Sequence, residues 1–276
     1  MLINRTNIFE ITKNLNLKPE KDYGQNFLVE SEIASRIVER LEINEKDKIL
    51  EIGPGLGSLT HFISLKSSPC DAVDIDFRMI KFLEEIYGGS SVIKLINNDV
   101  RKVDISKYSK IIGNLPYNIT TELITFLLLN GKSCQKLVLM CQAEAFARFS
   151  ASTGSDYGAV SVLVHLLGES KKLFVVKAGS FYPAPKCESI VFELQLNGKI
   201  CRDDCYDTYF LAKTLFLNRR KTILNNLSLF LKDRPSAEKI CFDLGIRTTL
   251  RPEQLTPFQY LAIYKTIKLN ATIKKY

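Results

Sequence analysis

Short apolar runs alternate with amphipathic segments from about residue 30 to residue 145. Apolar runs of this length predict strands, and apolar residues three and four positions apart predict helices. The predicted strands span residues 48–52, 72–76, 92–96, 111–112 and 137–140, and the predicted helices 59–66, 80–87 and 122–129. Repeated strand–helix units of this length indicate a mostly parallel, doubly wound α/β sheet with its ligand crevice at the carboxyl ends of the strands.

The hydrophobic pattern changes after Phe149. Residues 174–176 and 190–196 predict two strands around a proline-containing loop at 181–187, and we expect them to extend the sheet edge in antiparallel fashion. Beyond residue 198 the pattern is helical, and the predicted helices span residues 209–217, 223–231, 237–244 and 257–268. We therefore expect an α/β domain at 1–200 and a small helical domain at 201–276.

The positive charge of the chain is concentrated in the predicted helical domain. Of the net charge of +8, residues 201–276 contribute 14 basic and 7 acidic side chains, whereas residues 1–200 contribute 24 and 23. A generally lysine-rich proteome would spread such an excess along the whole chain. The local excess therefore favours a nucleic-acid surface in the helical domain.

Several classes of protein are excluded by what the chain lacks. No apolar run is long enough to span a bilayer, and the N-terminus has no signal-peptide pattern, so we expect a cytoplasmic protein without membrane association. Seven cysteines without a CxxC pair predict reduced thiols, and the presence of only two histidines argues against a metal site. Nothing in the sequence indicates more than a monomer.

A glycine-rich turn follows the first predicted strand, in the segment Glu51-Ile-Gly53-Pro-Gly55-Leu-Gly57. A dinucleotide fingerprint would need its third glycine one residue later, which argues against NAD. The pattern resembles the cofactor turn of S-adenosylmethionine-dependent methyltransferases. Asp74, near the end of the next predicted strand, can accept hydrogen bonds from the two ribose hydroxyls of an adenosine, with Asp76 as second choice.

A third acidic residue, Asp99, closes the third predicted strand. In methyltransferases with this layout it accepts a hydrogen bond from the adenine amino group of the cofactor. An aspartate at this position could instead cap the turn that follows. The sequence leaves both interpretations open.

The segment Asn114-Leu115-Pro116-Tyr117 ends the fourth predicted strand. The amino nitrogen of adenine is a poor nucleophile because its lone pair is delocalised into the ring. The side-chain oxygen of Asn114 and the carbonyl of Leu115 can each accept one amino hydrogen, which directs the lone pair toward a sulfonium methyl group. Tyr117 can stack on the base, and an adenine inside a helix must flip out to reach such a site.

Taken together, these motifs resemble the family of adenine dimethyltransferases that modify small-subunit ribosomal RNA (rRNA), the bacterial KsgA enzymes and their eukaryotic Dim1 relatives. Seven segments carry the resemblance in order along the chain: 23–28, 51–55, 113–118, 142–144, 157–158, 181–186 and 216–222. The resemblance implies a Rossmann-like methyltransferase domain that uses S-adenosylmethionine. The implied substrate is a pair of adjacent adenosines in the 3′-terminal hairpin loop of the rRNA, each dimethylated within a pre-ribosomal particle during subunit biogenesis.

The resemblance also implies roles for residues that the pattern alone leaves unassigned. Cofactor contacts are implied for seven residues: Asn26, Leu28, Gly53, Gly55, Asp74, Asp99 and Asn114. Phe181 would be a second aromatic against the target base, although a core aromatic is an equally good interpretation. The remaining residues would face rRNA phosphates: Arg219, Arg220 and Lys221.

Two alternative functions and one departure from the family pattern stay open. A large-subunit rRNA adenine methyltransferase of the macrolide-resistance type shares the fold and chemistry, and a ribosome-assembly factor could keep the fold without the activity. Family members more often have Glu where Asp74 stands, so the carboxylate is one methylene shorter. The ribose contact then requires a closer backbone or a bridging water.

Overall fold

The computed structural model describes residues 2–15, 17 and 25–273. The chain forms two compact units, one made of Met1–Phe146 and Ser170–Leu196, the other of Ala147–Glu169 and Asn197–Tyr276. The last division falls close to the boundary expected near residue 200. Residues 147–169 group with the C-terminal helices because α7 (Ala159–Leu167) packs against α8 (Arg202–Phe216).

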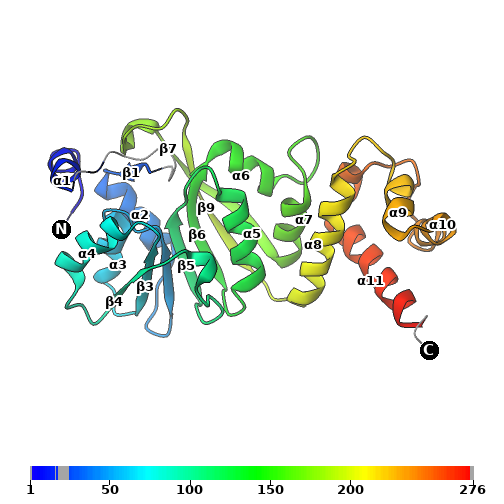
Figure 1. The fold of residues 1–276 in the computed structure, drawn as a ribbon, viewed down its shortest axis with the longest axis horizontal. Coiled ribbons are helices and arrows are strands. Elements are labelled where there is room, and N and C mark those ends of the chain that lie inside the picture. Colours follow the sequence, from blue (N-terminus) through cyan, green and yellow to red (C-terminus); the bar gives the residue numbers. More distant parts are fainter. Residues whose placement is uncertain (1, 16, 18–24, 274–276) are drawn as a thin grey trace. The chain divides into compact units, whose positions relative to one another are not determined.

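The first unit is built on a mixed β-sheet with the strand order β4-β3-β2-β5-β6-β9-β7 (Figure 1). The strands from β4 to β6 run parallel, and β9 pairs antiparallel with β6, which confirms the antiparallel addition to the sheet. The strand bounds are β2 Ile49–Ile52, β3 Cys70–Asp74, β4 Ile93–Asn97, β5 Lys110–Asn114, β6 Lys136–Gln142, β7 Gly168–Val176 and β9 Ser189–Leu196.

Successive strands are added toward opposite edges of the sheet on the two sides of the β2–β5 pair. From β2 the chain passes through α3 (Ser58–Ser64) to β3 and through α4 (Phe77–Tyr87) to β4, whereas from β5 it passes through α5 (Thr120–Asn130) to β6. Since such crossovers are right-handed, α3 and α4 cover one face of the sheet and α5 covers the other. A doubly wound sheet binds its ligand at such a central pair, outside the carboxyl ends of the strands.

The two strands of this central pair approach each other closely. The register pairs Ile52 of β2 with Gly113 of β5, and a Cβ atom on Gly113 would lie 2.6 Å from the Ile52 carbonyl oxygen. Every residue of β2 is buried, as is typical of a central strand covered on both faces. The close approach places the turn after Ile52 directly beside the segment that begins at Asn114.

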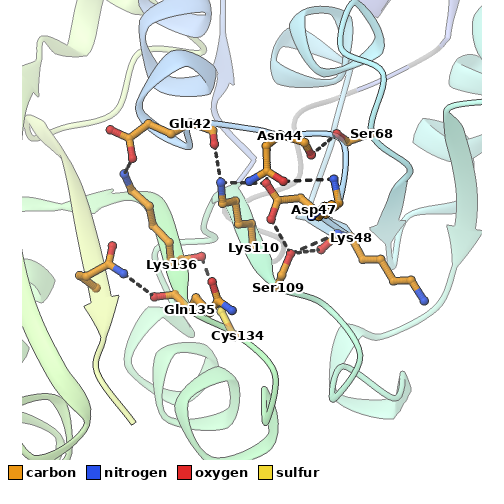
Figure 2. Close-up of polar contacts among 12 residues, drawn as sticks. Glu42, Asn44, Asp47, Lys48, Ser68, Ser109, Lys110, Cys134, Gln135 and Lys136 are labelled. Atoms are coloured by element: carbon orange, nitrogen blue, oxygen red, sulfur yellow. Dashed lines mark hydrogen bonds and ion pairs between the residues drawn. The ribbon is translucent and has the colours of Figure 1, made fainter. Parts of the chain in front are cut away.

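The amino ends of β5 and β6 carry two buried lysines, Lys110 and Lys136, which Figure 2 shows beside Glu42 and Asp47. Lys110 forms an ion pair with Asp47 at 2.8 Å and donates to the main-chain carbonyl of Glu42. Lys136 pairs with the Glu42 carboxylate at 2.7 Å and with Glu193 at 3.6 Å. Glu42 joins the two lysines from a left-handed backbone conformation, with φ of 53°. This cluster ties the chain after α2 (Ser31–Arg40) to the sheet, at the end opposite the carboxyl ends of the strands.

A short two-stranded sheet brings residues 25–28, the N-terminal arm, to the proline-containing loop. Strand β1 (Phe27–Leu28) pairs antiparallel with β8 (Phe181–Tyr182), so that Leu28 faces Phe181 in the register. Helix α1 (Ile8–Asn14) precedes the arm. Tyr23 and Gly24, the first two residues of the family-like segment 23–28, lie outside the described residues.

The second unit is helical. Besides α7 and α8 it contains α9 (Ile223–Leu231), α10 (Arg234–Asp243) and α11 (Pro257–Ile273), and α6 (Ala143–Ser150) leads into it. It carries 16 basic and 9 acidic residues, which is nearly all of the net charge of the chain. In the described part of the chain, no helix is long and apolar enough to cross a membrane.

Candidate active site

A cavity of about 300 Å³ opens at the carboxyl ends of β2, β3 and β5. A volume of this size lies at the lower end of the range for small-molecule and cofactor sites. Three segments surround the cavity: the N-terminal arm, the glycine-rich turn and the segment after β5. Nine of the predicted site residues line it, namely Asn26, Leu28, Gly53, Gly55, Asp74, Asn114, Leu115, Pro116 and Tyr117.

The glycine-rich turn adopts backbone conformations that side chains disfavour. The φ angles of Gly53, Gly55 and Gly57 are 64°, 54° and 90°, all in the left-handed region. A Cβ atom on Gly55 would lie 3.2 Å from the Phe27 ring, and one on Gly57 would lie 2.7 Å from Leu83 Cδ2. This path therefore favours glycine at all three positions, and Gly53 and Gly55 line the cavity.

Glu51 lines the cavity, a position that its place in the glycine-rich motif did not predict. It is 1% exposed, and Thr60 Oγ1 donates to its Oε2 at 2.8 Å. Its Oε1 is buried and has no hydrogen-bond partner among the described residues. Burial raises the pKa of the Glu51 carboxyl to about 8. An unpartnered buried carboxylate oxygen in a cavity fits a cationic ligand group such as the ammonium of S-adenosylmethionine.

Asp74 ends β3 and holds the glycine turn in place. Its Oδ2 accepts from the Gly55 amide at 3.2 Å, and its Oδ1 accepts from the Asp76 amide at 2.9 Å. Each carboxylate oxygen has a second lone pair, so both can still accept from a ribose hydroxyl. Burial raises the pKa of Asp74 to about 6. Asp76, the second choice, instead caps α4 and pairs with Arg78 at 2.6 Å.

Asn114 is fixed by the N-terminal arm so that its side-chain oxygen points away from that contact. Its Nδ2 donates to the Asn26 carbonyl at 3.0 Å. Because a carbonyl only accepts, this contact leaves Oδ1 on the other side of the amide. Asn114 Oδ1 is buried and has no partner among the described residues. The cavity therefore contains an acceptor oriented for a ligand that donates a hydrogen bond.

Leu115 and Tyr117 continue from β5 along the cavity wall. The Leu115 amide donates to the Met140 carbonyl at 2.9 Å, which holds the backbone of Leu115 against β6. The Tyr117 hydroxyl lies 2.7 Å from Ser189 Oγ, and burial raises the pKa of Tyr117 to about 12. Tyr117 therefore stays neutral at physiological pH and presents an aromatic surface rather than a charge.

Two of the residues predicted to contact the cofactor or the target base, Asp99 and Phe181, do not line the cavity. Asp99 caps the short helix Val100–Lys102 and binds the Arg101 guanidinium, with contacts down to 2.6 Å that hold the pKa of Asp99 below its usual range. It is Arg101 that reaches the cavity. Phe181 is 4% exposed and belongs to the hydrophobic core around β1 and α2. The cofactor contact of Asp99 and the base contact of Phe181 stay predictions.

The predicted rRNA-facing cations differ in their surroundings. Arg219 donates to three backbone carbonyls of the loop 154–157 at 2.7–3.1 Å, and its guanidinium lies over the Phe216 ring. Arg220 and Lys221 are both exposed. Arg219 therefore serves the structure of the second unit, and the two residues after it offer surface charge.

Comparison with known proteins identifies the family. A model described as "Ribosomal RNA adenine dimethylase" matches residues 16–269. The ribosomal RNA small subunit methyltransferase A of Natranaerobius thermophilus is 34% identical, covering 94% of this chain and 95% of the relative. The protein of the same name from Shouchella clausii is 35% identical, covering 96% and 95%.

The fold resembles that of a solved relative. The crystal structure of a dimethyladenosine transferase from Plasmodium falciparum matches with a TM-score of 0.75 at 22% identity, covering 89% of this chain and 98% of that one. This likeness confirms the predicted methyltransferase fold class. Because the family model matches almost the full length and the two bacterial relatives align over nearly their whole length, the chain belongs to the ribosomal RNA adenine dimethylase family.

Proposed function

We propose that this chain transfers methyl groups from S-adenosylmethionine to the N6 amino groups of two adjacent adenosines in the 3′-terminal hairpin loop of small-subunit rRNA, dimethylating each. Its family membership and the names of its relatives support methylation of small-subunit rRNA. We infer that the reaction takes place in the cytoplasm, on a pre-ribosomal particle, and that the enzyme acts as a monomer.

A single observation carries the proposed chemistry: the orientation of the Asn114 amide. The Asn26 carbonyl accepts a hydrogen bond from Asn114 Nδ2, so the buried Asn114 Oδ1 remains as an acceptor in the cavity. An adenine amino group donates hydrogen bonds, and its lone pair is delocalised into the ring. Two acceptors, each hydrogen-bonded to one amino hydrogen, localise that lone pair on the nitrogen. Asn114 Oδ1 and the Leu115 carbonyl are the acceptors that we assign to this step.

The remaining residues bind and orient the reactants. The cofactor, when bound, supplies an electrophilic methyl group on its sulfonium. Asp74 would accept hydrogen bonds from the ribose hydroxyls of the cofactor, and Glu51 would contact its ammonium group. Tyr117 stacks on the flipped-out base. The reaction needs no general base at the outset because the amino nitrogen loses its proton only after it has become positive.

Docking of the rRNA is assigned to the second unit. Its excess of seven positive charges attracts phosphates without reading sequence, and Arg220 and Lys221 are surface cations within it. Sequence selection then rests on which adenines are unpaired and within reach of the cavity. Binding of the particle and methyl transfer are therefore separable by mutation.

The experiment that tests the proposal replaces Asn114 by alanine. We expect Asn114→Ala to lower the rate of methyl transfer to unmethylated small-subunit particles by about 10²–10³-fold, as removal of one preorganised hydrogen-bonding group does in other enzymes. Cofactor affinity should change by less than about tenfold, the value of one neutral hydrogen bond. The matched control is Asn130→Ala at the exposed end of α5, which should retain the wild-type rate. Wild-type transfer by Asn114→Ala would contradict the mechanism.

The same assay separates the alternative functions. Labelled cofactor is incubated with small- and large-subunit particles from an unmethylated strain, and the methylated nucleotides are counted by mass spectrometry. We expect four methyl groups per small-subunit particle and none on the large subunit. Methylation of the large subunit would favour the macrolide-resistance type of enzyme. Particle binding without any transfer would favour an assembly factor.

A further inference from the structure

The proline-containing loop ends beside the segment that follows β5. Residues 181–187 lead into β9, whose first residue is Ser189, and Ser189 is 0% exposed. Ser189 Oγ lies 2.7 Å from the Tyr117 hydroxyl, across a sequence separation of 72 residues. The start of β9 thus contacts the cavity wall through Ser189, whereas Phe181, at the start of the loop, lies in the core.

Ser189 is held rigidly by the sheet. The register of β6 and β9 pairs it with Gln142, and the Ala143 amide donates to the Glu188 carbonyl at 3.2 Å. Tyr117, in contrast, lies beyond the end of β5, in a turn before α5. A hydrogen bond between the hydroxyl of Tyr117, on a turn, and the hydroxyl of Ser189, on a fixed strand, restricts where the Tyr117 ring can lie.

We propose that Ser189 is a positioning residue for methyl transfer: its hydroxyl anchors the Tyr117 ring so that the ring and Asn114 Oδ1 bracket the target base. This inference rests on the proposed function, because it assigns a base to that space. It gives the first residue of β9, which follows the proline-containing loop, a role in the reaction.

The anchor matters most for the second methyl transfer to each adenosine. A monomethylated amino group has one hydrogen left, so it cannot donate a hydrogen bond to both Asn114 Oδ1 and the Leu115 carbonyl. The orientation of the base then depends more heavily on stacking, and therefore on the position of the Tyr117 ring. Loss of the anchor should leave monomethyladenosine as an accumulated product.

The test compares Ser189→Ala, Tyr117→Phe and the double variant. Each single change removes the hydrogen bond and leaves one hydroxyl without its partner, whereas the double change removes both hydroxyls. We expect each single variant to lower the methyl transfer rate by about tenfold and to raise the ratio of monomethyl to dimethyl product, with cofactor affinity unchanged. The double variant should regain resistance to urea while its rate and product ratio stay at the level of the single variants.

Two outcomes would overturn the proposal. If the double variant recovers the wild-type rate and product ratio together with its stability, the hydrogen bond serves folding alone. If both single variants keep the wild-type rate and ratio, the ring needs no anchor. Failure of the proposed function is visible separately, since the wild-type protein would then transfer no methyl group to small-subunit particles in the same assay.

Discussion

Glu51 should make the stability of the cofactor-free protein fall as the pH rises. Burial raises the pKa of its carboxyl from 4.5 to about 8 in the folded chain. A carboxyl whose pKa is raised by folding contributes to the free energy of unfolding. This contribution is fully present below the pKa of the unfolded chain and is lost as the pH rises through the pKa of the folded chain. The affected window is therefore about pH 4.5 to 8, and at pH 7 about nine-tenths of the folded molecules carry a protonated Glu51.

The size of the effect follows from the shift. A difference between 4.5 and about 8 corresponds to about 5 kcal/mol over the whole window, with a slope of about 1.4 kcal/mol per pH unit between the two pKa values. Glu51→Gln removes the titration, so the free energy of unfolding of this variant should exceed that of the wild type by a margin that grows with pH. Urea unfolding of both proteins at pH 5, 6, 7 and 8 measures this margin. Glu45→Gln, at an exposed carboxyl, is the matched control and should follow the wild type.

Cofactor binding offers a second measurement of the same group. A cationic group beside Glu51 favours the ionised carboxylate, so binding at pH 7 should release about 0.9 proton, the fraction still bound beforehand. Titration calorimetry in buffers of different ionisation enthalpy counts the protons released. Glu51→Gln should release close to none. Equal proton release by the two proteins, or parallel stability curves across the pH range, would refute the reasoning.

Four other changes test separate parts of the structure. Gly57→Ala should lower the free energy of unfolding by roughly 1–3 kcal/mol, because a side chain there meets both a left-handed backbone and a close neighbour; thermal unfolding measures this. Replacing Arg220 and Lys221 together by Gln should reduce the salt slope of particle binding by about two without altering cofactor affinity. Arg219→Gln should instead destabilise the second unit, detected by proteolysis of the loop that it contacts, and an unchanged digestion pattern would contradict its assigned contacts. Lys136→Met should lower the free energy of unfolding by roughly 1–3 kcal/mol and leave the specific activity intact, as measured by urea unfolding and the particle assay.

The strands could be predicted from the sequence more easily than the helices of the second unit. Central strands are buried on both faces and appear as continuous apolar runs, so β2 and β6 were predictable to within about two residues. Helix α9 matches its predicted span of 223–231. Helix α8 begins at Arg202, well before the predicted start at Tyr209, because its first half buries Cys205 and Thr208 rather than large apolar side chains. Helix α7 is apolar on most of its surface and so lacks the amphipathic period that predicts a helix.

The candidate site was predictable where its residues are neighbours in the sequence. The glycine turn and the segment 114–117 each form one local motif, and both line the cavity. Contacts between distant segments left no such signal. The hydrogen bond of Ser189 to Tyr117 and those of Arg219 to the loop 154–157 join segments far apart in the chain, so a sequence pattern cannot show which partner each side chain finds.

The N-terminal arm is joined to the site by two main-chain carbonyls. The Asn26 carbonyl accepts a hydrogen bond from the side-chain amide of Asn114, and the Leu28 carbonyl accepts one from Ser58 Oγ at 2.6 Å. Main-chain atoms are common to all amino acids, so evolution can exchange side chains along the arm without losing these bonds. A single inserted or deleted residue, in contrast, would shift both carbonyls at once. Natural variation in the arm should therefore consist of replacements at constant length.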